Sequence, residues 1–306
     1  MTRPCLIALD WGTSNLRASL LGAAGRVLEQ RAGAAGVMAV RAGGFEDALR
    51  GLCGDWIDAH RVPLVASGMI GSRQGWREAP YLDCPATLAD AARRLTTVDL
   101  AGGGRLHIVP GLCGVDDAGQ PDVMRGEETQ LWGAGLAEGE VAVLPGTHSK
   151  WAWTGADGAV LQFQTHMTGE LFAVLREHSI LGRLMPAGVA EDPAAFERGV
   201  RLGLSSPAGL LHTLFAARTN GLMGRLPAEG LGDFLSGILI GAEIAGATAT
   251  RRPASAVTLI GGAALCARYA TALGLAGMPH RLADDDVTTR GQWQLALAAG
   301  LVEASK

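Results

Sequence analysis

The amino-acid sequence predicts an α/β protein built from two lobes. At 306 residues the chain is long for one compact core, which favours two lobes. The first 110 residues read as β-β-β-α-β-α-β, the order of an α/β lobe. The second half also opens with a strand, a polar glycine-containing turn, a strand and a hairpin, so it echoes the first. We expect an N-terminal lobe over residues 1–110, completed by a C-terminal helix within 290–306, and a second lobe over 111–289.

The composition excludes several classes of protein. With 48% hydrophobic and 18% charged residues, the chain has the balance of a folded protein. A net charge of −4 argues against nucleic acid as a partner. The longest apolar stretch, residues 234–250, contains Glu243 and many Gly and Ala residues. We therefore expect a buried helix there, and no membrane partner.

Cysteine use and the N-terminus favour a cytoplasmic location. The five cysteines are an odd number without metal-ligand spacing, and a chain of this size does not need disulfides. We expect reduced, structural thiols. The first five residues lead directly into a predicted strand with no signal-peptide pattern.

Hydrophobic periodicity assigns the elements of the first lobe in order. Residues 6–9 form a short apolar run typical of a buried strand, and residues 16–20 alternate as a half-buried strand does. Apolar residues at helical spacing predict an amphipathic helix over 45–59. The other expected elements are strands over 26–31, 62–67 and 106–109, a glycine-punctuated loop over 68–76 and a helix after Pro85.

The second lobe is read in the same way. Asp157-Gly158 is a turn signal and predicts a hairpin around it. Gly237, Gly241 and Ala245 form a small-residue stripe on a predicted long helix, which allows close packing. The other expected elements are a polar loop over 116–125, a helix over 127–136, strands over 141–144 and 256–260, mostly helix over 165–230, and helices over 263–273 and 292–303.

The turn between the first two strands carries the first candidate chemistry. Asp10 ends a buried strand, where a carboxylate is costly unless it has a function, and it could hold a divalent cation. Gly12 allows a ligand to approach the backbone. Donors suited to phosphate oxygens come from Thr13, Ser14 and Asn15. An ordinary β-hairpin with a polar turn is the alternative interpretation.

Three glycine-containing segments follow one another along the chain. They are Asp10-x-Gly12-Thr13-Ser14-Asn15, Leu144-Pro-Gly146-Thr147-His148-Ser149 and Leu259-Ile-Gly261-Gly262-Ala263. This order resembles the ATPase fold shared by sugar kinases, heat-shock ATPases and actin, in which two duplicated lobes each supply a phosphate turn and the third segment is the adenosine loop. The resemblance implies a two-lobe actin-like ATPase (ribonuclease H-like) fold with a nucleotide cleft between the lobes.

Within this superfamily the chain resembles the 2-dehydro-3-deoxygalactonokinases. The matching segments, in collinear order over most of the chain, are Ala8–Arg17, Ser67–Arg73, Met124–Gln130, Pro145–Lys150 and Met167–Leu171. The resemblance implies a carbohydrate kinase of galactonate breakdown, which uses ATP and Mg²⁺ to phosphorylate 2-dehydro-3-deoxy-D-galactonate at its 6-hydroxyl. The chain has no GxxxxGK[ST], GxGxxG, HExxH or GxSxG motif, which argues against P-loop, Rossmann, metalloprotease and α/β-hydrolase readings.

The second and third segments supply further candidates for nucleotide binding. These are Gly146, Thr147, His148, Lys150, Gly261 and Gly262. His148 could donate to a phosphate or be an ordinary turn residue. Lys150 could bring an ammonium to the phosphates or lie on the surface. The glycine pair 261–262 could let the purine pass against the backbone, as the resemblance implies, or only permit a sharp strand–helix turn.

Phosphoryl transfer to an alcohol needs a carboxylate near the attacking hydroxyl. Glu127 and Glu128 lie between the polar loop and a helix, just before the second phosphate turn. Many sugar kinases of this fold have an Asp at the corresponding helix start, and the register leaves open which Glu matches it. The dipole of a helix favours acids in its first turn in any case. Asp116 and Asp117 are the fallback.

A sugar-acid substrate carries a carboxylate, which Arg binds in bidentate fashion. Arg73, in the glycine-punctuated loop, is the first candidate and Arg125 the second. A solvated surface arginine is the alternative for Arg73. Weaker candidates for contacts with sugar hydroxyls are Ser72, Gln74 and Asp83.

Two alternative functions stay open at this point. One is a kinase of the same fold acting on another sugar or sugar acid, and the other is a non-catalytic nucleotide-dependent regulator. The Glu127/Glu128 pair and the arginine-bearing loop favour an enzyme with a small-molecule substrate. The oligomeric state, with a homodimer as one option, and the galacto or gluco preference also stay open.

Overall fold

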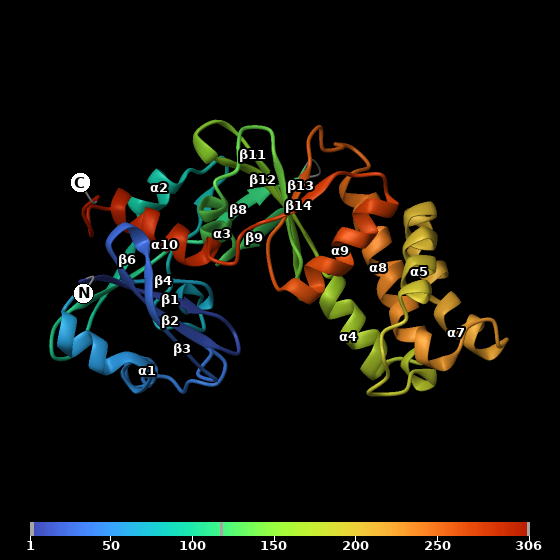
Figure 1. Ribbon diagram of the computed structural model, residues 1–306, viewed down its shortest axis with the longest axis horizontal. Helices are drawn as coiled ribbons and strands as arrows, with labels where there is room; N and C mark the ends of the chain where they lie inside the picture. Colours follow the sequence, from blue (N-terminus) through green and yellow to red (C-terminus); the bar gives the residue numbers. More distant parts are fainter. Residues whose placement is uncertain (1–2, 117–118, 305–306) are drawn as a thin grey trace. The chain divides into compact units, whose positions relative to one another are not determined.

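The computed structural model describes residues 3–116 and 119–304, which form two compact units. Unit 1 comprises residues up to 138, residues 154–163 and the segment from 284 onward, and unit 2 comprises residues 139–153 and 164–283. Each unit has its own sheet (Figure 1).

The expected lobe boundary at residue 110 differs from this division, because unit 1 extends to residue 138. The reason is the packing of helix α3 (Glu127–Ala134) on helix α10 (Val287–Ala298). A Cβ atom on Gly133 would lie 1.8 Å from the backbone oxygen of Val287, so only glycine permits this approach. Both α3 and the last helix, α10, therefore belong to unit 1.

The sheet of unit 1 has six strands in the order β3-β2-β1-β4-β7-β6. Their bounds are β1 Pro4–Trp11, β2 Leu16–Gly22, β3 Val27–Gly33, β4 Leu64–Ser67, β6 Thr96–Asp99 and β7 Arg105–Ile108. Strand β1 is antiparallel to β2 and parallel to β4, and Asp10 is in register with Ser67. The carboxyl ends of β1 and β4 therefore lie at one edge of the sheet.

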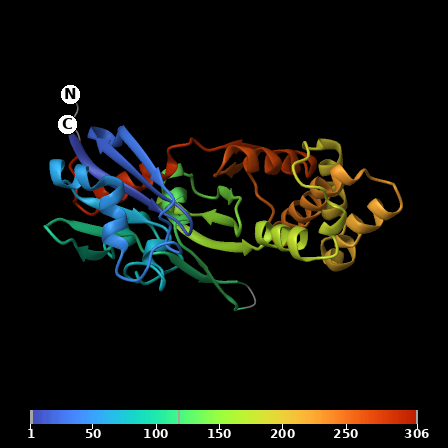
Figure 2. The same ribbon diagram turned by 90° about the horizontal axis from the view of Figure 1, so that it is seen from below.

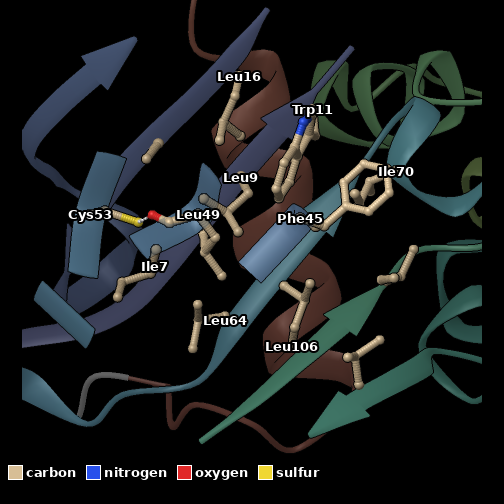
Figure 3. Close-up of a cluster of buried hydrophobic side chains, with 14 of the residues drawn as sticks. Ile7, Leu9, Trp11, Leu16, Phe45, Leu49, Cys53, Leu64, Ile70 and Leu106 are labelled. Carbon is tan, nitrogen blue, oxygen red and sulfur yellow. Dashed lines mark hydrogen bonds between the residues drawn. The ribbon is translucent and has the colours of Figure 1, made fainter. Parts of the chain in front are cut away.

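Helix α1 (Phe45–His60) covers one face of this sheet, as its amphipathic pattern predicts. Ile7, Leu9 and Trp11 alternate along β1 and are buried against Phe45 and Leu49 of α1 (Figure 3). Helix α10 lies behind the sheet in the same view. The sheet is therefore enclosed between helices, as the short apolar strands require.

A small three-stranded sheet, in the order β5-β8-β9, also belongs to unit 1. Its strands are β5 Leu82–Asp83, β8 Leu112–Val115 and β9 Pro121–Met124. The loop expected over 116–125 is wrong over residues 121–124, which form β9. Val123 of this strand pairs with Cys113, although the strand begins with Pro and Asp, which are typical of turns. The helix expected after Pro85 is the short α2 (Leu88–Ala92). It begins with a capping box formed by Thr87 and Asp90.

Unit 2 is built on a sheet in the order β12-β11-β10-β13-β14. The bounds are β10 Val141–Leu144, β11 Ser149–Thr154, β12 Val160–His166, β13 Val257–Leu259 and β14 His280–Leu282, with β12 passing from unit 1 into unit 2. The hairpin predicted around Asp157-Gly158 is confirmed, and Asp157 adopts a left-handed φ of 55° there. Strand β10 is parallel to β13, so the turns that follow them emerge at one edge.

The remainder of unit 2 is helical, as predicted for residues 165–230 (Figure 2). The helices are α4 Thr168–His178, α5 Pro193–Ser205, α6 Leu210–Leu214, α7 Ala216–Leu222, α8 Leu231–Ala247 and α9 Ala263–Leu275. The glycine stripe of α8 packs on α5. Cβ atoms on Gly237 and Gly241 would lie 2.2 and 2.4 Å from the backbone oxygens of Phe196 and Val200.

Helix α8, with the short turn before it, is the one helix in the described part of the chain that could span a membrane by length and composition. However, 72% of its apolar window is buried inside the protein. The core of unit 2, which includes Phe234, Ile238 and Ile240, accounts for its apolar side chains. This agrees with the buried helix expected from the sequence.

Candidate functional site

The first turn of unit 1 has a hydrogen-bonded backbone and exposed side chains. The backbone N–H of Gly12 donates to the Asn15 oxygen (2.9 Å), which closes the turn. The loop that contains Gly36 and Val37 packs against this turn. The N–H of Val37 donates to the Gly12 oxygen (3.0 Å), and a Cβ on Gly36 would lie 2.2 Å from the Ser14 carbonyl carbon. The side chains of Thr13, Ser14 and Asn15 remain exposed.

Asp10 lies at the wall of a cavity of about 620 Å³ within unit 1. Its carboxylate accepts a hydrogen bond from Arg17 Nη1 at 3.2 Å. Burial raises the pKa of the Asp10 carboxyl above its ordinary value, and the Arg17 guanidinium acts in the opposite direction. Sequence reasoning missed Arg17, although alternation along β2 places it beside Asp10.

The backbones of β1, β4 and α3 meet at this edge of unit 1. Gly68 follows β4 with a φ of +95°, and a Cβ there would lie 2.8 Å from the Trp11 oxygen. Gly126 precedes α3 with a φ of +107°, and its Cβ would lie 3.2 Å from the Gly68 Cα. Two glycines thus bring the start of α3 next to the strand that ends in Asp10.

The two glutamates at the start of α3 differ in environment. Glu127 is half-buried, and its Oε2 accepts from the backbone N–H of Arg125 at 3.0 Å. Glu128 is fully buried, and its carboxyl accepts from the N–H of Gly126 (2.6 Å) and the hydroxyl of Thr129 (3.0 Å). The structure therefore makes the pair asymmetric, as adjacent helical positions predict.

Burial raises the pKa of the Glu128 carboxyl to about 8, and the Glu127 carboxylate acts in the same direction. The dipole of α3, although it favours acids in the first turn of the helix, does not offset this rise in the pKa of Glu128. The cost of removing its charge from water exceeds the benefit of the dipole and of the hydrogen bonds.

This carboxyl predicts a pH dependence of stability. Between pH 4.5 and about 8 the folded chain holds a proton on Glu128 that the unfolded chain has released. The free energy of unfolding should therefore fall as the pH rises through this window. Glu128→Gln cannot lose a proton, and its amide can still accept from Gly126 and donate to Thr129. Urea unfolding across the window should give a flatter profile for the variant, and parallel profiles would contradict the assignment.

The candidate substrate residues lie in different environments. Arg73, the first candidate, has a side chain that is 84% exposed and pairs with Glu78 at 3.1 Å on the surface. Gln74 and Asp83 are also exposed, and Asp83 accepts from the Cys113 thiol. Arg73 thus fits the solvated alternative, because a solvent-exposed ion pair of this kind holds a side chain only weakly.

Arg125 is the opposite case, at 9% exposed. Its Nη2 donates to the Ala79 oxygen (2.7 Å), and its guanidinium stacks on the ring of Tyr81 (4.3 Å). Its Nε and Nη1 are buried and have no hydrogen-bond partner in the described part of the chain, and neither has the hydroxyl of Ser72. A Cβ on Gly71 would lie 2.8 Å from Arg125 Nη1, so these unsatisfied groups flank one glycine.

In unit 2 the second turn follows β10. The N-terminus of α4 packs directly on it, since the N–H of Glu170 donates to the Thr147 oxygen (2.9 Å) and a Cβ on Gly169 would lie 2.4 Å from the Gly146 oxygen. His148 is paired with the Glu170 carboxylate through its Nε2. Lys150 lies within β11 and is 4% exposed, so the surface alternative for this lysine is wrong.

The glycine pair 261–262 lies beside this turn, at the end of the neighbouring strand β13. Gly261 has a φ of +150°, and a Cβ on it would lie 3.5 Å from the Pro145 oxygen. A Cβ on Gly262 would meet nothing within 4 Å, so the space over this backbone is open. Within unit 2, the pair therefore permits both the strand–helix turn and a close approach by a flat ligand.

Comparisons with known proteins agree with this arrangement. The family described as 2-keto-3-deoxy-galactonokinase matches residues 10–295. The 2-dehydro-3-deoxygalactonokinase of Escherichia coli (strain K12) is 41% identical over 273 residues, which cover 89% of this chain and 90% of that protein. A crystal structure of a Sinorhizobium meliloti protein assigned to the same activity has a TM-score of 0.89 at 38% identity, covering 96% of this chain and 98% of that one.

A more distant neighbour defines the fold. The xylulose kinase of Lactobacillus acidophilus has a TM-score of 0.51 at 11% identity and covers 98% of this chain and 92% of that one. The two-lobe ATPase fold predicted from the three glycine segments is confirmed.

Proposed function

The chain belongs to the 2-keto-3-deoxy-galactonokinase family of carbohydrate kinases, and from this premise we propose that it transfers the γ-phosphate of ATP to the 6-hydroxyl of 2-dehydro-3-deoxy-D-galactonate in the cytoplasm. The reaction forms a bond between that hydroxyl oxygen and the γ-phosphorus and breaks the bond to the β-phosphate oxygen, so that ADP leaves. The observation that carries the choice of an acid substrate is the buried guanidinium of Arg125, whose Nε and Nη1 have no hydrogen-bond partner among the described residues.

The nucleotide is assigned to the three glycine-containing turns. We assign phosphate oxygens to the donors of residues 12–15 in unit 1 and 146–148 in unit 2, and the purine to the open backbone at Gly261 and Gly262. Lys150 supports this assignment, because a lysine that is 4% exposed and forms no ion pair within the described residues needs an anion nearby.

A Mg²⁺ ion fits Asp10. This cation usually takes one or two protein carboxylates together with substrate phosphates and water, so a cluster of protein ligands is not required. The described residues contain no group of three or more His, Cys, Asp or Glu that could hold a metal. Asp10 offers one half-buried carboxylate beside the first phosphate turn. When bound, the ion would neutralise charge on the phosphates.

We assign the general base to Glu127. Its partner Glu128 is fully buried and hydrogen-bonded on both oxygens, so it cannot reach a substrate hydroxyl. Glu127 is half-buried, at a helix start fixed by the glycine contacts with β1 and β4. A carboxylate there would accept the proton of the 6-hydroxyl as the new bond forms.

Arg125 would bind the carboxylate of the substrate. Leaving buried guanidinium N–H groups unpaired is costly, and a carboxylate is the acceptor that fits them best. The unpartnered hydroxyl of Ser72 lies beside Gly71 and could donate to the same group or to the neighbouring keto oxygen. A neutral sugar would leave these groups unsatisfied, which argues against the neutral-sugar kinase.

The test combines a substrate panel with one variant. ADP release should follow addition of sugar acids and not of hexoses or hexosamines. Arg125→Met should raise KM for the keto-acid roughly 10- to 150-fold, the value of a charge-assisted contact, and leave KM for ATP unchanged. Arg73→Met is the matched control and should change neither.

Other outcomes separate the alternatives. Turnover of a neutral sugar, or an unchanged keto-acid KM in Arg125→Met, would contradict the assignment of Arg125. ATP binding without turnover of any panel member would favour the regulator. Asp116, the fallback for the base, is exposed and its carboxylate accepts from the N–H of Gln120, and Asp117 lies outside the described residues.

A further inference from the structure

A buried carboxylate in unit 2 has no role in the reaction described above. Glu243 of α8 is 5% exposed. Its Oε1 accepts from the Ser149 hydroxyl (2.7 Å) and the Trp151 indole N–H (2.9 Å), and its Oε2 accepts from the Tyr269 hydroxyl (2.5 Å). From this geometry we propose that Glu243 is a positioning residue that holds the second phosphate turn for ATP.

The partners of Glu243 come from the segments that border the turn. Ser149 directly follows His148, the last residue of the turn. Tyr269 lies on α9, the helix that begins after Gly262. Helix α4, which packs on the turn, also contacts α8, the helix that carries Glu243. One carboxylate therefore connects the start of β11 with α9, the helix that follows the glycine pair 261–262.

The cost of burying this charge indicates that position matters here. A buried carboxylate is expensive, and none of the ion pairs among the described residues includes Glu243. The hydrogen bonds satisfy it instead, each from a different side chain with a fixed direction. Such a fully satisfied network rigidifies the segments that it joins.

The turn has another side-chain support in the pair of His148 with Glu170. The N-terminus of α4 also packs on the backbone of Gly146 and Thr147. Loss of Glu243 would release Ser149 and Tyr269 together. The phosphate-binding backbone would then be mobile before ATP binds, and ATP binding would have to order it.

The inference rests on the proposed function, and the test uses ATP binding so that the two can fail separately. Calorimetric titration of each variant with a non-hydrolysable ATP analogue and Mg²⁺ measures the dissociation constant without the sugar acid. Glu243→Ala should weaken binding roughly tenfold or more. Glu243→Gln keeps an acceptor oxygen for Ser149 and Trp151 and should stay within about threefold of the parent chain.

The control is Ile240→Ala, on the same helix and in the same core. It should lower the melting temperature by a cavity effect and leave the affinity for the analogue unchanged. If Glu243→Ala does not fold, Ser149→Ala and Tyr269→Phe, which each remove one hydroxyl, carry the test and should each weaken binding. KM for the sugar acid at saturating ATP should not change in any of these variants.

Three results would overturn the inference. They are equal affinities in the parent chain and Glu243→Ala, equal losses in Glu243→Ala and Ile240→Ala, and unchanged affinity in both single-hydroxyl variants. If instead the parent chain binds no ATP analogue, the proposed function fails first.

Discussion

Glu127→Gln should lower kcat by at least about 100-fold while binding of the sugar acid is largely retained. A sugar hydroxyl has a pKa far above neutrality, so its proton must leave as the bond to phosphorus forms. The amide of Gln can still accept the N–H of Arg125 that now meets Oε2, so the start of α3 should keep its shape. Single-turnover kinetics at saturating ATP and sugar acid would measure the chemical step directly.

Glu128→Gln is the matched control for this prediction, one position along the same helix. It should cost far less in kcat and act mainly through stability, because Glu128 is fully buried and bonded within α3. The reverse order of the two effects would make Glu128 the base. Near-normal kcat in both variants would move the search to Asp116 and Asp117.

Features set by neighbouring residues could be predicted from the sequence. The first hairpin, the helix over 45–59 and the turn at Asp157-Gly158 depend on local periodicity and turn chemistry, and the structure has all of them. The glycine stripe of α8 could also be predicted, because Gly237 and Gly241 fall on one face of a helix. The fold was predicted from the resemblance of the three glycine segments, in their order along the chain, to those of a known ATPase fold.

Features set by distant residues could not be predicted in this way. The sequence around Arg73 and Arg125 does not indicate which of the two is buried. Arg125 is buried by Ala79 and Tyr81, more than forty residues away, whereas Arg73 is exposed to solvent. The raised pKa of Glu128 likewise depends on burial that no local pattern reports. The boundary at 138 depends on how α3 meets α10, which a glycine in each helix permits.

Asp10→Asn should leave the fold intact and lower kcat about 100-fold or more, because Mg²⁺ would lose its charged protein ligand. Burial already disfavours the ionised form of Asp10, and the pair with Arg17 is partly exposed, so removing the charge should cost little stability. The melting temperature without ligand should therefore stay close to that of the parent chain.

The metal dependence separates this role from a structural one. The concentration of Mg²⁺ needed for half-maximal activity should rise in Asp10→Asn, and the thermal stabilisation by Mg²⁺ with ATP should shrink, since ligand-induced stability follows affinity. Asp99→Asn is the control, because Asp99 also pairs with an arginine, Arg105, but does so on the surface. Full activity with unchanged Mg²⁺ dependence in Asp10→Asn would remove Asp10 from the site and leave the metal to the phosphates alone.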